Sequence, residues 1–290
     1  SKKACEKIYN QILQTTKLEA KDIGYIVATG YGRIRVPFAN EVVTEITCHA
    51  RGANYFFPSA RTVIDIGGQD SKAIKLDAKG NVLDFSMNDK CAAGTGRFLE
   101  VMARTLEIEL DEMGELSLKG SDSVSISSLC TVFAESEVVS LIGADKKTED
   151  ICKGLNISIA KRVSAQAKRV GLEEDVIMTG GVAKNIGVVR EREKRLSCSI
   201  KIPEEPQIAG ALGAALIALE NALARKTANK VSVISEAASI ADIQLDDDVR
   251  PKIGYFCTYT PVEIIRAAGF HPIRIKGEEG DNSSSDELLC

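Results

Sequence analysis

Residues 62–88 constrain the fold more than any other part of the sequence, because side-chain character alternates with the period of two that is typical of strands and glycines mark where a strand ends. TVIDIGG, residues 62–68, is typical of a buried strand that stops at two glycines. SKAIKLD, residues 71–77, and VLDFSMN, residues 82–88, alternate in side-chain character, and the intervening AKGN predicts a turn. We therefore expect three consecutive antiparallel strands.

Helical spacing dominates the chain after these strands. Apolar residues recur every four positions from Ile151 to Val163, which predicts a long amphipathic helix that ends at Gly171. The order of elements predicts an α/β fold built on a β-β-β-α-β-α type unit. We expect further helices at residues 2–16, 41–53, 94–98 onward, 111–116, from 134, from 183 and at 209–224, and further strands at 23–29, 124–126, 175–181 and 199–202.

The length of 290 residues predicts about two domains. After Arg225 the chain turns polar and acidic, so residues 226–250 are expected to be a linker. Residues 251–290 then have the strand-helix-strand pattern that opens an α/β domain, with the helix at 260–269. A domain that stops after one such unit cannot bury a core, so this last stretch is expected to be truncated.

Composition excludes several classes of function. The 37 basic and 41 acidic residues give a net charge of −4, which offers no electrostatic footprint for nucleic acid or an anionic membrane. The amino end lacks the apolar core of a signal peptide, so we expect a cytoplasmic protein with no membrane span. Eight cysteines are too few for a disulfide scaffold, and in a reducing cytosol they are expected to be buried, metal-binding or catalytic.

Two glycine pairs follow strand patterns and suit a nucleotide. In DIGGQDS, residues 65–71, free backbone amides can approach phosphate oxygens and a carboxylate can hold hydrated magnesium. An ordinary hairpin turn explains this short motif equally well. MTGGVAKN, residues 178–185, repeats the pattern, with Gly180 and Gly181 opening onto the amino end of a helix.

Cys91 and Cys130 each precede a predicted helix amino terminus. Such positions stabilise thiolates and donate hydrogen bonds to sulfur, as an iron-sulfur cluster requires. A cubane cluster normally takes four cysteines, so one chain would supply half a site and the hypothesis implies a homodimer. The alternative is two structural thiols, and we interpret Cys5, Cys48, Cys152 and Cys198 in that way, as small buried hydrophobic residues.

Other ionisable residues have ordinary explanations beside the functional ones. His49 lies four residues after Glu45 on a predicted helix and could pair with it on a metal, but no third ligand is evident, which favours a structural histidine. Glu135 and Glu137 could be catalytic carboxylates or first-turn charges that favour the helix dipole, and the second interpretation suits Glu137 better.

Taken together, these motifs resemble the ATP-dependent activators of 2-hydroxyacyl-CoA dehydratases, within the ATPase family that also serves benzoyl-CoA reductases. The resemblance runs from about residue 20 to residue 224 and rests on six motifs in family-like order and spacing. They are ATGYGR, VIDIGGQDSK, NDKCAAGTGRF, CTVFAESEV, MTGGVAKN and IAGALGAAL. It implies an actin/Hsp70/sugar-kinase type fold, with two ribonuclease-H-like halves around an ATP cleft. The expected halves of the domain 1–225 are residues 1–29 with 207–225, and residues 30–206.

The resemblance also implies the roles of individual residues. A 4Fe-4S cluster would be shared between two protomers through Cys91 and Cys130, and ATP would bind with Mg²⁺. Asp65, Gln69 and Glu135 are expected to be catalytic. The positions expected to bind the nucleotide are Asp65, Gly67, Gly68, Gln69 and Asp70 at the phosphates, Gly180, Gly181 and Asn185 by the adenosine, and Gly210 and Gly213 in the second connecting helix. The implied partners are a second copy, a dehydratase or reductase component as electron acceptor, and reduced ferredoxin or flavodoxin as electron source.

Both ends depart from the family pattern. The chain begins downstream of the first phosphate loop of the family, so we expect either a fragment or weakened ATP binding. Residues 251–290 resemble the opening of the dehydratase or reductase component, which suggests an activator fused to its electron acceptor. Cys257 and Cys290 would then belong to the acceptor's own cluster site.

The expected mechanism is that ATP binding and hydrolysis close the two halves and shift the helix pair that flanks the cluster. One low-potential electron would then pass to a docked partner. A small-molecule kinase of the same superfold is the first alternative, since it shares the phosphate and adenosine turns and needs no cysteine. A catalytically silent interaction module is the second.

Overall fold

The computed structural model describes residues 2–88, 91–122, 124–127, 130–236, 252–255 and 271–274. The chain forms two compact units. One unit combines residues 1–48 with residues 210–289, and the other runs from His49 to Ala209. The second unit contains both glycine pairs and both cysteines of the predicted cluster site.

A five-stranded sheet with the order β5-β4-β3-β6-β7 forms the centre of the second unit. Its strands are β3 Thr62–Ile66, β4 Ser71–Leu76, β5 Val82–Asn88, β6 Val176–Thr179 and β7 Ile200–Lys201. β4 pairs antiparallel with both β3 and β5, which confirms the three predicted antiparallel strands. β6 pairs parallel with β3 and β7, so β3 is the central strand, and all five of its residues are buried.

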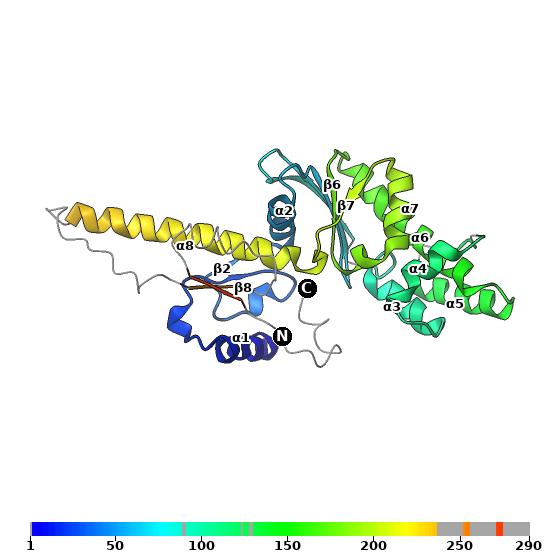
Figure 1. Ribbon diagram of the computed structural model, residues 1–290, viewed down its shortest axis with the longest axis horizontal. Coiled ribbons are helices and arrows are strands. Elements are labelled where there is room, and N and C mark those ends of the chain that lie inside the picture. The colour runs from blue at the N-terminus through cyan, green and yellow to red at the C-terminus, as the bar shows by residue number, and fades with distance from the viewer. Residues whose placement is uncertain are drawn as a thin grey trace. The chain divides into compact units, whose positions relative to one another are not determined.

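Helices cover this sheet on both sides. α6 Thr148–Arg169 packs on β4 and β5, and α4 Glu112–Lys119 and α7 Ile186–Leu196 pack on α6. α3 Gly96–Thr105 packs against α5 Thr131–Gly143. In Figure 1 the part of α2 (Glu45–Phe56) that belongs to this unit lies on the other side of the sheet from α6 and α7. The core joins β3 to α6 through side chains such as Ile64, Ile66, Leu155 and Ile159.

Three sequence expectations need correction. Residues 124–127 are described without a strand, because Val124 has no neighbouring strand and its carbonyl packs against Gly154 of α6. Of the strand expected at 23–29 only β1 Val27–Ala28 forms, since it pairs with the two-residue β2 Glu41–Val42 alone. Because β2 occupies its expected first turn, helix α2 starts at Glu45 rather than at residue 41.

The first unit is built from α1 Lys2–Thr16, the β1–β2 pair and α8, which follows the segment Pro206–Ile208 and runs Ala209–Glu236. α8 continues into the segment expected to be a linker. β8 Lys252–Tyr255 and β9 His271–Arg274 pair in parallel. The helix expected at 260–269, Cys257 and Cys290 lie outside the described residues.

Short 3-10 turns and one apolar helix complete the description. The turns are Ala20–Asp22, Arg33–Arg35, Gly181–Lys184 and Pro206–Ile208. In the described part of the chain one stretch, Pro206–Arg225, has the length and apolar composition that could cross a membrane. A buried core helix can meet the same criterion, so this finding is weak evidence for a span.

Candidate functional site

The two glycine pairs meet at one edge of the sheet. β3 and β6 are parallel neighbours, with Asp65 in register with Thr179, so their carboxyl ends point the same way. Gly67 and Gly68 follow β3, and Gly180 follows β6 directly. Ligands of open α/β sheets bind outside the carboxyl ends of the strands, which makes this edge the candidate nucleotide site.

The first turn is tied to the amino end of α3. The Gly67 amide donates to the Asp70 carbonyl at 3.0 Å, which closes the turn. The amides of Gly96 and Arg97 donate to the carbonyls of Gly67 and Gly68, both at 2.8 Å. A Cβ placed on Gly68 would meet no atom within 4 Å, so the outer side of this turn is open to an approaching group.

The second turn is glycine for a steric reason. Gly180 has φ of 82°, a left-handed conformation that favours glycine. A Cβ there would overlap the Ile66 carbonyl and lie 2.8 Å from Asp65 Oδ1. The Gly180 amide donates to the Pro206 carbonyl at 2.9 Å. Gly180 therefore keeps the two strand ends in contact, whereas a Cβ on Gly181 would lie 3.3 Å from the Gln207 side chain.

A buried charge cluster lies directly behind the first turn. Lys72 Nζ lies 2.6 Å from Asp70 Oδ1 and 3.3 Å from Asp65 Oδ2. The three side chains are between 3% and 7% exposed. Burial of a charge is costly unless it is paired, so Lys72 is the counter-ion that permits two buried carboxylates here.

The pairing decides the protonation of this cluster. Burial by itself raises the pKa of Asp65, but the charges of His49 and Lys72 and a hydrogen bond from Thr179 outweigh it and hold that pKa below its ordinary value. Burial by itself lowers the pKa of Lys72, yet the two carboxylates raise it above its ordinary value. The Asp65 carboxylate and the Lys72 ammonium group therefore both stay charged at neutral pH.

His49 and Thr179 join this site, although sequence reasoning gave neither a role in it. Thr179 Oγ1 donates to Asp65 Oδ1 at 3.0 Å, and His49 Nδ1 lies 3.2 Å from Thr179 Oγ1 and 3.4 Å from Asp65 Oδ1. Glu45, which was considered as a metal partner of His49, accepts a hydrogen bond from Arg33 at 2.7 Å. The sequence does not show that β6 pairs in parallel with β3, and this pairing is what places Thr179 beside Asp65.

The remaining nucleotide residues have mixed surroundings. Gln69 is exposed at the tip of the first turn. Asn185 caps α7 by accepting from the Val188 amide at 3.0 Å, and its side chain also bonds Asn156 of α6. Gly210 and Gly213 are buried in α8, as the resemblance implies, and a Cβ on Gly213 would overlap the Cys48 carbonyl.

Glu135 lies at the far end of α3 from the glycine turn. Its Oε1 is 3.5 Å from Thr105 Oγ1, and Thr105 is the last residue of α3, whereas Gly96 at the other end touches the turn. At about 1.5 Å rise per residue the two ends of α3 are roughly 14 Å apart. No contact described for Glu135 supports the catalytic role predicted for it.

Cys91 and Cys130 hold the positions that the sequence predicts. Cys130 is the N-cap of α5, and Cys91 lies in the loop before α3, where its carbonyl accepts from Asn88 Nδ2 at 2.9 Å. Both thiols are free and partly exposed, whereas Cys48 and Cys152 are buried and Cys5 and Cys198 only partly so. Among the described residues no three His, Cys, Asp or Glu side chains gather as a metal site.

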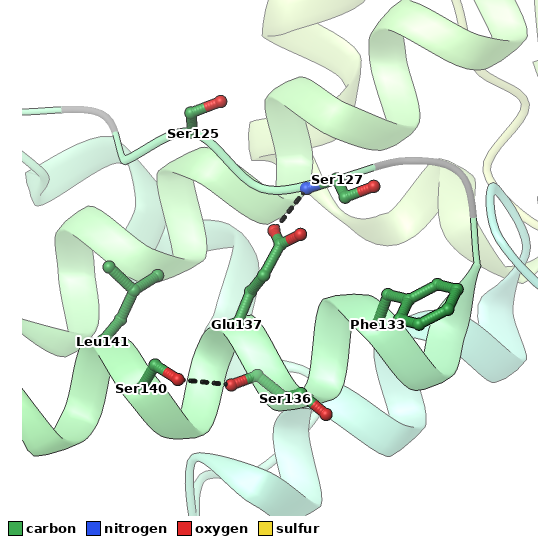
Figure 2. Close-up of a pocket in the computed structure, with 7 residues that line it drawn as sticks. All are labelled: Ser125, Ser127, Phe133, Ser136, Glu137, Ser140 and Leu141. Atoms are coloured by element: carbon green, nitrogen blue, oxygen red, sulfur yellow. Dashed lines mark hydrogen bonds between the residues drawn. The ribbon is translucent and has the colours of Figure 1, made fainter.

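The surface beside Cys130 is apolar and hollowed. α5 exposes Val132, Phe133, Val139 and Ile142, with Val132 and Phe133 about two-thirds exposed. A hollow of about 590 Å³ lies here, between α5 and the segment of Ser125 and Ser127. Figure 2 shows Glu137 reaching across it to accept from the Ser127 amide. Such a face on a helix suits a protein contact.

Known proteins match this chain over most of its length. The family model of the BadF/BadG/BcrA/BcrD ATPases matches residues 1–218. The 2-hydroxyisocaproyl-CoA dehydratase activator of Clostridioides difficile is 51% identical over 217 residues, which are 75% of this chain and 80% of that protein. The activator of lactoyl-CoA dehydratase of Anaerotignum propionicum is 53% identical over 217 residues, 75% of this chain and 84% of that protein.

The fold matches as well. The solved structure of the activator of the 2-hydroxyisocaproyl-CoA dehydratase from Clostridium difficile, with bound ADPNP, aligns with a TM-score of 0.73 and 47% identity. The alignment covers 81% of this chain and 85% of that one. The predicted fold class, α/β of the actin/Hsp70/sugar-kinase type, is confirmed.

Proposed function

The chain belongs to the BadF/BadG/BcrA/BcrD ATPase family, and from this premise we propose that it hydrolyses ATP to activate a 2-hydroxyacyl-CoA dehydratase-type partner through a 4Fe-4S cluster. The cluster would be held between two copies of the chain and deliver one electron per cycle. The observation that carries the ATP site is the meeting of two glycine turns at the carboxyl ends of β3 and β6.

ATP would bind with its phosphates against the open side of the first turn. Gly67 and Gly68 allow close approach, and Gln69 is exposed where it can reach a phosphate or an attacking water. Asp65 and Asp70 offer the carboxylate oxygens that Mg²⁺ prefers, and the lowered pKa of Asp65 keeps that carboxylate ionised, as a hydrated magnesium ion requires. Gly180, Gly181 and Asn185 would lie along the adenosine.

The cysteine pair fits half of a cubane cluster. Within the part of the chain that the structure describes, no third ligand gathers with these thiols, so one chain offers half of a four-thiolate site and a second copy would supply the other two thiols. The exposed apolar residues of α5 beside Cys130 suit that homodimer. A bound cluster would supply low-potential one-electron transfer, with reduced ferredoxin or flavodoxin as the source. Such chemistry requires reduced thiols, which supports a cytoplasmic location under anaerobic conditions.

The α3 amino end links the two sites. Gly96 and Arg97 bind the carbonyls of the phosphate turn, and Cys91 lies five residues before Gly96. Asn88 braces the intervening loop by donating to the carbonyls of Cys91 and Ala93. A shift of the phosphate turn between nucleotide states would therefore move the loop that carries Cys91, which gives ATP a route to the electron transfer.

An anaerobic iron and sulfide assay with EPR on the reconstituted protein, sized by chromatography, tests the cluster. We expect about four irons per dimer, lost in both Cys91→Ala and Cys130→Ala but kept in the matched control Cys152→Ala, whose thiol is buried in the core. ATP hydrolysis is measured on the same samples. A folded dimer without iron would return both cysteines to a structural role and favour the small-molecule kinase.

Residues 251–290 are a separate part of the proposal. We propose that they begin a dehydratase or reductase-like domain after the ATPase domain of residues 1–225. The parallel pairing of β8 with β9 supports a strand-helix-strand unit. Cys257 and Cys290 would then serve the acceptor. Expression of the parent open reading frame and its mass determination would test the fusion, and a protein of activator size would refute it.

A further inference from the structure

We propose that His49 is a positioning residue of the ATPase site, which holds the Asp65 carboxylate in place through the hydroxyl of Thr179. The proposal rests on the function proposed above, because it assumes that Asp65 works at the phosphate end of ATP. It assigns a role to a histidine that sequence reasoning interpreted as structural.

Three elements bring these side chains together. His49 lies on α2, Asp65 at the end of β3 and Thr179 at the end of β6. The His49 side chain is 14% exposed and that of Asp65 is 3% exposed, so solvent screens their contact weakly. Further along α2, a Cβ on Gly52 would overlap the Ala209 carbonyl, so the backbone of this part of α2 packs closely against Ala209.

The hydrogens available on these groups fix the direction of the two hydrogen bonds that join His49, Thr179 and Asp65. An ionised carboxylate only accepts, and the Lys72 ammonium group, whose Nζ lies 3.3 Å from Asp65 Oδ2, favours the ionised form of Asp65. The single hydroxyl hydrogen of Thr179 therefore points to Asp65 Oδ1 at 3.0 Å, and Thr179 Oγ1 can only accept from His49. The Nδ1 atom of His49 must then carry a hydrogen, whether the ring is neutral or charged.

The consequence is that both oxygens of Asp65 are held. Oδ1 receives Thr179, with His49 Nδ1 3.4 Å away, and Oδ2 lies 3.3 Å from Lys72 Nζ. A carboxylate held on both sides keeps one orientation, which a phosphate-handling group requires. Loss of His49 removes the contact on the other side of the Thr179 hydroxyl, so Asp65 Oδ1 is then held by the Thr179 hydrogen bond without that second support.

Kinetics of the full chain test the role. In His49→Leu, which has no donor, we expect kcat for ATP hydrolysis to fall about 10–100-fold, the usual effect of removing a supporting hydrogen bond, while KM changes less than about threefold. His49→Asn places an amide N–H near the position of Nδ1 and should recover most of the lost kcat. Asn54→Ala, on the same helix and with its side-chain amide donating to the Pro58 carbonyl, is the matched control.

A second readout does not depend on turnover. The chain has two histidines, so the imidazole ¹⁵N spectrum is simple and His49→Asn assigns it. We expect a hydrogen on Nδ1 of His49 in the wild type, and a changed Nδ1 signal in Thr179→Val. A His49 ring with hydrogen on Nε2 alone would overturn the proposal, and so would a His49→Asn variant as slow as His49→Leu.

Asp65→Asn separates the two hypotheses. If Asp65→Asn abolishes ATP hydrolysis while His49→Leu keeps the wild-type kcat, the ATP site stands and the positioning role is refuted. If Asp65→Asn hydrolyses ATP like the wild type, the proposed phosphate site fails and the positioning role fails with it. Equal losses of folding stability in His49→Leu and Asn54→Ala would show that any difference in kcat is not an effect of stability.

Discussion

Lys72 Nζ lies 2.6 Å from Asp70 Oδ1, and both side chains are almost completely buried. This ion pair stands behind the first glycine turn and also reaches Asp65. Because two carboxylates depend on one ammonium group, the candidate ATP site is tied to the stability of the fold.

Lys72→Met should destabilise the protein by about 3–5 kcal/mol, because it removes the ammonium group that two buried carboxylates share. Urea unfolding measures the loss. Lys194→Met is the control, since Lys194 pairs with Glu191 but is 69% exposed, and such surface pairs are worth about 1 kcal/mol at most. Equal urea midpoints for the two variants would contradict the ascribed role of Lys72.

The two glycine turns should respond differently to a methyl group. Gly180→Ala should lower the free energy of unfolding by about 1–3 kcal/mol, because it combines a left-handed φ with overlap on the Ile66 carbonyl. Gly68→Ala has open space around its Cβ and should change that free energy by less than about 0.5 kcal/mol.

Gly68→Ala should weaken ATP binding, although it should hardly change the free energy of unfolding. If phosphates approach the open side of the turn, the Gly68→Ala methyl group should weaken ATP binding about tenfold or more, which is a loss of about 1.4 kcal/mol. Calorimetric titration with a non-hydrolysable ATP analogue measures this. A Gly68→Ala protein that binds the analogue like the wild type would place the phosphates elsewhere.

Arg192 should be dispensable for folding. It is completely buried on α7, and burial lowers its pKa to about 9. Its Nη1 contacts Met178 Sδ at 3.4 Å, and within the described residues its Nε and Nη2 have no hydrogen-bond partner. Arg192→Met should therefore stabilise the protein, by about 1–4 kcal/mol, as measured by the urea midpoint. Arg190→Met, at an exposed position of the same helix, is the control, and a destabilised Arg192→Met would reveal an anionic partner.

The apolar face of α5 should control dimerisation. Phe133 is 64% exposed, so Phe133→Asp should not harm the monomer but should bury a charge in any interface formed there. We expect a shift from dimer to monomer in light scattering, together with loss of iron. Leu118→Asp, on α4 at 50% exposure, should leave the dimer intact. A fully dimeric, iron-loaded Phe133→Asp protein would place the interface on another face.

The sequence by itself determined the local elements around the site. Alternation in residues 62–88 set β3, β4 and β5, because period-two patterning depends only on which face of each strand is buried. The glycine pairs marked the strand ends, and the positions of Cys91 and Cys130 before α3 and α5 could be read from chain order alone. The strand expected at 124–126 was wrong, because a strand exists only where a partner strand pairs with it.

Only the tertiary structure decided which side chains surround Asp65. Thr179 is 114 residues away in the sequence and reaches Asp65 because β6 pairs in parallel, in register, with β3. His49 faces the same carboxylate from α2, although its spacing from Glu45 suggested a different partner. Strand register and helix packing are set by the collective burial of the core, which no local sequence pattern specifies. They place the charged and polar side chains around Asp65, next to the first glycine turn.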